Sequence, residues 1–266
     1  MGNRAAEEAC LNRAIELALK QRGWTKKFAK SLQAGLQDGL KKVDKDRPDF
    51  VVLCPPMENG KKALIGIEHF RVDAHVIQKK TNAVASTAVV EQRRVDEFYD
   101  EHRDRVLKTH QAPQKTLDGL AELLKNQVDV EQKATYSNFV ASFEYGLEKH
   151  IKHVDAYWKN LNDIRGNNDI KLGFLIEIHG NFDDLYLWRG GKTRKAIRGR
   201  TPIFDDIVNL IEKKVDTKRF SFVILYFVET LDTKKDRVVV VQTKAIREYL
   251  KKQNEFVYKY AGKDFR

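Results

Sequence analysis

The chain has 266 residues and a formal net charge of +11, so one large domain or two small ones are expected. Its 42% apolar content is ordinary for a globular protein, and no apolar run reaches the roughly 18 residues of a membrane span. These numbers predict a protein outside the membrane. The positive charge favours nucleic acid (DNA or RNA) as a partner, because neutralising phosphates releases counterions.

Two further features predict a cytoplasmic location. The first residues lack the apolar core of a signal peptide. The only two cysteines, Cys10 and Cys54, lie in separate predicted elements with apolar surroundings. They are expected to be buried reduced thiols, and neither has the spacing of a zinc site.

The N-terminal part begins with two predicted helices. Apolar residues recur close to the helical period over 5–22, and Gly23 ends this helix. Placing the residues at about 100° intervals puts Glu7 inside the apolar face. A second helix is predicted over 26–42.

Two strands are predicted next, and each carries one carboxylate. Residues 47–54 open with Asp49, and residues 63–70 contain Glu68. The link between them holds two prolines, an asparagine and a glycine, which favours a hairpin. A carboxylate in an apolar strand is costly unless it is paired or binds a metal. The convergence of Asp49 and Glu68 therefore predicts a site for a hard cation with oxygen ligands.

The middle of the chain shows helical patterns and almost no strand signal. A long charged helix is predicted over 85–110, a short one over 116–124, and helical spacing continues through 130–161. This all-helical insertion is assigned to residues 81–166. Its charged helices offer a surface for a possible homodimer.

Strand patterns return in the C-terminal part, residues 167–266, which joins residues 1–80 in the predicted core. The predicted elements are a strand over 172–179 with 185–188 as its hairpin partner, a helix over 202–215, a strand over 220–228 buried on both faces, a strand over 237–242 and a helix over 243–252. The order predicts an α/β fold with a mixed central sheet flanked by helices.

The hairpin motif resembles a known nuclease family. Pro48-Asp49, followed by Glu68 within Ile-Gly-Ile-Glu-His-Phe, is similar to the PD-(D/E)XK superfamily of metal-dependent phosphodiesterases. The resemblance implies a restriction-endonuclease-like core in which Asp49 and Glu68 hold Mg²⁺ or Mn²⁺. It also implies that the backbone carbonyl of His69 is a third ligand, and that Glu7 matches the acid of the leading helix.

One position departs from that family. The motif lysine belongs two residues after Glu68, where this chain has Phe70. Phenylalanine neither orients water nor stabilises an anion. The missing cation has four candidate substitutes, which are Arg71, Lys79, Lys80 and Arg93. The other interpretation is a site that has lost activity and keeps its scaffold.

Simpler interpretations stay open for the acidic residues. Asp49 could merely start a strand, Glu68 could pair with a buried Arg or Lys, and Glu7 could complement the helix dipole.

Three histidines raise the same choice between a site and an ordinary surface. Glu177 and His179 share a strand face, either as ligands or an acid/base pair, or as a solvated sheet face. His150 and His153, one helical turn apart, are expected at the surface because a third ligand is lacking.

The segment 189–200 is basic and rich in glycine, which suits contact with a phosphate backbone. Its Gly-Gly-Lys-Thr is not a P-loop, because Leu187 stands where the first glycine belongs. Trp188 and Tyr186 could stack on bases. The predicted nucleic-acid contacts are Arg71, Arg189, Lys192, Arg194, Lys195, Arg198 and Arg200.

The sequence thus predicts a metal-dependent nuclease that hydrolyses phosphodiester bonds of DNA or RNA. The alternative is a catalytically inactive module on the same scaffold that binds nucleic acid or protein.

Overall fold

The computed structural model describes residues 4–41, 47–56, 62–72, 116, 118–122, 136–180, 182, 187–189, 192–194, 201–229 and 233–260. The chain divides into two compact units. The first joins residues 1–72 with 143–263, and the second joins residues 73–142 with 264–266.

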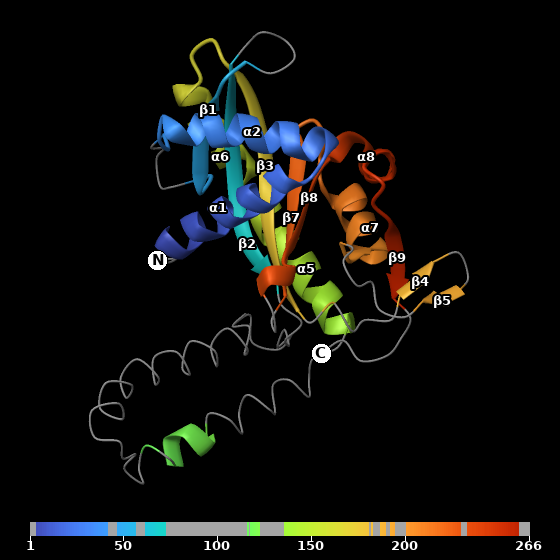
Figure 1. Cartoon of the computed structure of the whole chain (residues 1–266). Helices are drawn as coiled ribbons and strands as arrows, with labels where there is room; N and C mark the ends of the chain where they lie inside the picture. The colour runs from blue at the N-terminus through green and yellow to red at the C-terminus, as the bar shows by residue number, and fades with distance from the viewer. Residues whose placement is uncertain are drawn as a thin grey trace. The chain divides into compact units, whose positions relative to one another are not determined.

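A mixed five-stranded sheet forms the centre of the first unit, as the sequence predicts (Figure 1). Its strand order is β1 (Phe50–Cys54), β2 (Ala63–Val72), β3 (Asp169–Gly180), β7 (Phe222–Glu229) and β8 (Arg237–Gln242). The two outer pairs are antiparallel, whereas β2, β3 and β7 run parallel to one another. The predicted hairpin of β1 and β2 is confirmed, and so is a central strand over β7 that is buried on both faces.

Helices α1 (Arg4–Lys20) and α2 (Gly23–Gln37) cover one face of this sheet, and both cross its near side in Figure 1. Their apolar sides pack on alternate residues of the strands, such as Ile65 and Ile67 of β2. Small residues on α1 and the close approach of Gly35 on α2 let both helices lie near the strands. Successive residues of a strand point to opposite faces, so this core uses only one half of each strand.

The other face of the sheet is covered by the helical segment that precedes β3. Helices α5 (Tyr136–Ile151) and α6 (Val154–Ile164) are separated by a turn at Lys152 and His153, where the sequence predicts one helical run. Leu161 of α6 lies against Gly66, and Gly146 of α5 lies against Phe70. A Cβ on either glycine would come within 3.0 Å of these side chains, so close packing depends on glycine here.

The C-terminal part adds helices α7 (Asp205–Lys214) and α8 (Ile246–Lys252), with short 3₁₀ turns at Thr233–Lys235 and Thr243–Ala245. A second sheet has the order β5 (Lys192–Arg194), β4 (Leu187–Arg189), β9 (Val257–Tyr260) and β6 (Ile203–Phe204).

One predicted pairing is wrong. Residues 185–188 were expected to pair with the strand over 172–179, but β4 pairs with β5 and β9. Both edges of β3 are already occupied by β2 and β7. A strand this apolar is suited to the middle of a parallel sheet, where both faces are buried. The predicted helix over 202–215 begins later, at Asp205, because Ile203 and Phe204 pair with β9.

The second unit is described only at residues 116, 118–122 and the first two turns of α5, all of which are helical. The long helix expected over 85–110, and most of the proposed dimer surface, lie outside the described residues. The helical insertion therefore stays a prediction. Among the described helices, none has the length and apolar character that crossing a membrane requires.

Candidate functional site

The two predicted carboxylates meet at the start of β1. Phe50 pairs with Ile67, and one further step in this antiparallel register puts Asp49 opposite Glu68. Asp49 Oδ2 accepts a hydrogen bond from the backbone N–H of His69 (2.7 Å). Arg4 of α1 donates to the backbone carbonyl of Asp49 (2.7 Å), which fixes this end of the strand without neutralising the carboxylate.

The electrostatics of this pair are unfavourable for two ionised groups. Glu68 is only 5% exposed. Burial, followed by the charge of Glu68, raises the pKa of Asp49 to about 7, and the N–H of His69 opposes this only in part. Neither carboxylate forms an ion pair with Lys or Arg within the described residues. The simpler interpretation, in which a buried Arg or Lys pairs with Glu68, has no support in this part of the chain.

The partner of Glu68 comes from α5. His150 Nδ1 donates to Glu68 Oε1 at 2.7 Å. The second oxygen, Oε2, is buried without any hydrogen-bond partner among the described residues, and so is the hydroxyl of Tyr157 on α6. Burial, and then the adjacent Glu68 carboxylate, raise the pKa of Tyr157. A hydrogen-bond interaction with Glu68 also contributes to this raised pKa, so the Tyr157 hydroxyl lies close to the carboxylate.

Phe70, two residues after Glu68, is buried at 6% exposure. Its ring stacks on the His150 ring, with centroids 4.8 Å apart and planes 12° from parallel, and meets Phe174 edge-on. The side chain that faces Glu68 from this position is therefore an aromatic support for His150.

The other predicted catalytic residues are placed as follows. Glu7 is half-buried in the first turn of α1, and its charge helps to raise the pKa of Asp49. Arg71 lies on the opposite face of β2 from Glu68, where Arg71 Nη2 donates to His179 Nδ1 (3.2 Å). Lys79, Lys80 and Arg93 lie outside the described residues.

A second polar cluster lies on that opposite face, under α1. Glu177 Oε2 accepts from His69 Nε2 (3.0 Å), and Glu177 Oε1 accepts from His179 Nε2 (2.5 Å). Burial alone would raise the pKa of Glu177, but the hydrogen bonds and charges of His179 and His69 outweigh it and hold the pKa well below its usual range. Glu177 and His179 are therefore bonded to each other and only partly exposed, each side chain at 17%.

Cys10 of α1 completes this cluster. One ligand atom each of Cys10, His69 and Glu177 lies within 4.8 Å of the other two. Burial, and then the Glu177 carboxylate, raise the pKa of the Cys10 thiol. The prediction of two free, buried thiols is confirmed, since neither cysteine is in a disulfide.

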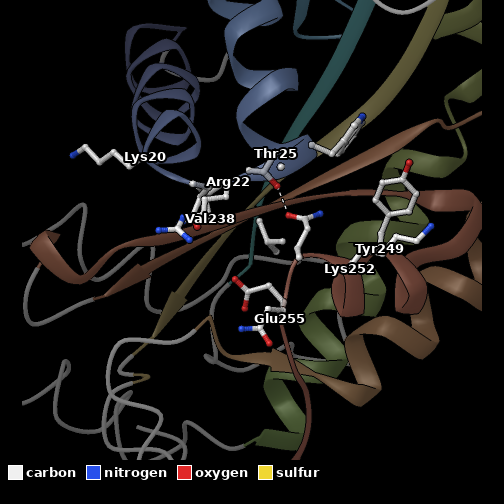
Figure 2. A pocket seen from close by; sticks show the side chains of 13 residues that line it. Lys20, Arg22, Thr25, Val238, Tyr249, Lys252 and Glu255 are labelled. Carbon is white, nitrogen blue, oxygen red and sulfur yellow. Dashed lines mark hydrogen bonds between the residues drawn. The ribbon is translucent and has the colours of Figure 1, made fainter.

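A separate hollow of about 620 Å³ lies beside the start of α2 (Figure 2). Lys20, Arg22 and Lys252 line it together with Tyr249, and Thr25 is hydrogen-bonded to Gln253 within it. It shares no residue with either carboxylate cluster.

The basic segment begins with a hairpin. Arg189 and Lys192 pair across β4 and β5, and Arg194 ends β5. Lys195, Arg198 and Arg200 lie outside the described residues, as does Tyr186.

No family description, curated protein or solved structure matches this chain.

His150, Tyr157 and Cys10 are the residues that the sequence alone did not assign to a site. The His150–His153 spacing was visible, but a surface position was expected because no third ligand is near in sequence. His150 meets Glu68 across 82 positions. No local pattern records such a contact, since it depends on how α5 lies on the sheet.

Proposed function

We propose that this protein is a metal-dependent nuclease of restriction-endonuclease-like fold, in which Asp49 and Glu68 hold Mg²⁺ or Mn²⁺. One observation carries the proposal: two largely buried carboxylates face each other, and one oxygen of Glu68 is left without a partner. Such a pair is stable at neutral pH only if one group takes a proton or a cation lies between them.

The donor set suits a hard divalent cation. Mg²⁺ and Mn²⁺ prefer oxygen ligands, and carboxylates of Asp and Glu are the usual ones. Two carboxylate oxygens are available as metal ligands. Neither Glu68 Oε2 nor Asp49 Oδ1 accepts a hydrogen bond within the described residues. The backbone carbonyl of His69 is the third ligand that the family resemblance implies.

The roles of the residues follow from their contacts. When bound, a divalent cation supplies Lewis-acid polarisation of a phosphate and of an attacking water. Asp49 is held by the N–H of His69, and Glu68 is oriented by His150, which is itself supported by Phe70. Glu7 is an accessory acid that adds negative potential near Asp49. The basic hairpin and Arg71 are proposed to contact the nucleic-acid backbone.

The test is cleavage of single- and double-stranded DNA and RNA with Mg²⁺ or Mn²⁺. Asp49→Asn and Glu68→Gln should each reduce the single-turnover rate by at least about 100-fold, because each removes a charged ligand. Asp163→Asn, an exposed carboxylate on α6, is the matched control and should cleave normally. Cleavage that survives both ligand variants would reject the assigned site.

One observation favours a second candidate, an inactive module that binds nucleic acid or protein. Phe70 is buried among rings, so the position that carries the family's lysine cannot reach solvent or substrate. This candidate predicts salt-sensitive binding of nucleic acid, or binding of a protein, without cleavage and without uptake of Mn²⁺ in calorimetry. Uptake of Mn²⁺ that requires Glu68 would favour the nuclease.

The buried, unpaired thiols of Cys10 and Cys54 support the proposal that the protein acts in the cytoplasm, where thiols stay reduced.

A further inference from the structure

We propose that the cluster on the other face of β2 is a transition-metal site, formed by Cys10, His69 and Glu177 with His179 beside them, and that it binds Zn²⁺. This site is distinct from the oxygen-ligand centre of the proposed nuclease. It does not depend on nuclease activity.

The donor atoms are of the kinds that zinc prefers. Thiolate sulfur, imidazole nitrogen and a carboxylate oxygen are the three common protein ligands of Zn²⁺, whereas Mg²⁺ takes oxygen alone. They come from three separate segments, since Cys10 lies on α1, His69 on β2 and Glu177 on β3. The parallel pairing of β2 and β3 brings His69 and Glu177 together, and α1 closes over them.

The spacing is close to that of a loaded site. Ligands at about 2.0–2.3 Å from one ion in a tetrahedron stand roughly 3.3–3.8 Å apart. The Cys10, His69 and Glu177 atoms already lie within 4.8 Å of one another, with His69 Nε2 and Glu177 Oε2 at 3.0 Å. Rotation of the side chains about their own bonds would bring the three atoms to these separations.

The surroundings also fit a zinc site. Cys10 belongs to the apolar core between α1 and the sheet, at 8% exposure, while Glu177 is 17% exposed and gives a route for an ion. A bound dication would place positive charge between Glu177 and the sulfur of Cys10. The thiolate of Cys10 would then be favoured over the thiol.

His179 is the nearest candidate for a fourth ligand. Its Nε2 bonds Glu177 Oε1, and its Nδ1 accepts from Arg71. If His179 coordinates the ion through Nε2, its ring proton must sit on Nδ1. The hydrogen bond from Arg71 to Nδ1 would then have to break. The alternative fourth ligand is water, as in zinc sites with three protein ligands.

The two proposed metal sites are kept apart by the strand itself. Glu68 and His69 are neighbours on β2 and point to opposite faces. His69 adjoins both proposed sites, through its backbone on one side and its ring on the other, so they are tested separately by changing Cys10 or Glu68, each of which belongs to one site alone.

The experiment is titration of the full chain with Co²⁺, a spectroscopic substitute for Zn²⁺, followed by displacement with Zn²⁺. Cobalt bound to a thiolate gives a charge-transfer absorption in the near ultraviolet. The expected result is one equivalent of this absorption in the wild type, lost on adding Zn²⁺. Cys10→Ser should remove it, and Glu177→Gln should weaken Co²⁺ binding by at least about 10-fold.

The chain provides its own control, because Cys54 is the only other thiol. Cys54→Ser should keep the absorption. Circular dichroism checks that each variant is folded. The proposal is overturned if the wild type gives no absorption, if Cys10→Ser retains it, if Cys54→Ser removes it, or if Glu177→Gln binds Co²⁺ as tightly as the wild type.

Discussion

Asp49 and Glu68 illustrate how one residue's titration depends on a neighbour that is distant in sequence. An isolated Asp ionises near pH 4, but the pKa of Asp49 is raised to about 7 by burial and by Glu68. The folded protein therefore holds a proton on Asp49 that the unfolded chain releases. Between about pH 4 and 7 the folded state binds more protons than the unfolded state, so stability falls as the pH rises.

This gives a prediction for the metal-free protein. Between about pH 5 and 7.5 the free energy of unfolding should fall by about 2–3 kcal/mol more in the wild type than in Asp49→Asn, which cannot titrate. Urea denaturation in the presence of a chelator measures both. Adding Mg²⁺ at the higher pH should restore the wild type selectively, because a ligand of the folded state stabilises it. An equal pH dependence in both proteins would contradict the assigned shift.

At the scale of elements, β2 serves two sites because its residues alternate. Glu68 and Phe70 face α5 and α6, while His69 and Arg71 face the side of α1. Helix α5 contributes the hydrogen bond from His150 that orients Glu68. Gly146 lets this helix approach the Phe70 ring closely, so that His150 can reach Glu68. Among the described residues, the side chain two positions after Glu68 thus supports the His150 ring that bonds Glu68.

The role of α5 is tested with His150→Ala. We expect the cation concentration for half-maximal cleavage to rise by about 10–100-fold, which is the usual effect of losing a hydrogen bond to a metal ligand. His153→Ala is the control, since His153 lies three residues later and has no side-chain hydrogen bond to Glu68 among the described contacts. His150→Asn should recover part of the loss, because an amide can still donate to Glu68. Equal effects of the His150→Ala and His153→Ala variants would indicate general destabilisation of the helix.

At the scale of the molecule, each cluster includes residues from the C-terminal half of a parallel strand. Glu68 and His69 are in that half of β2, and Glu177 and His179 are near the end of β3. Open α/β sheets commonly bind ligands at these ends. The net charge of +11 adds a long-range attraction for polyanions that is independent of any single contact.

Salt dependence tests whether the basic hairpin carries nucleic-acid binding. The affinity for a labelled DNA duplex should fall linearly with salt on a double-logarithmic plot. Lys192→Gln with Arg194→Gln should reduce that slope by about 2, since each phosphate contact contributes about 0.9. Lys26→Gln with Lys27→Gln removes the same charge from exposed positions of α2 and should leave the slope unchanged. If both pairs change the slope equally, only net charge is acting.

The sequence by itself determined the elements that depend on local patterns. Helical periodicity located α1, and the apolar runs with turn residues located the hairpin of β1 and β2. Because a hairpin is a local structure, its register also brought Asp49 to Glu68 without knowledge of the rest of the fold.

Only the tertiary structure decided which distant segments meet. It placed β3 between β2 and β7 and not against residues 185–188, brought His150 to Glu68, and closed Cys10 over His69 and Glu177. Such contacts join residues about 50 to 170 positions apart, and they arise from burying whole apolar faces against one another. Since the burial of apolar surface is non-directional, the pattern within a segment says that a face is buried but does not say against which partner.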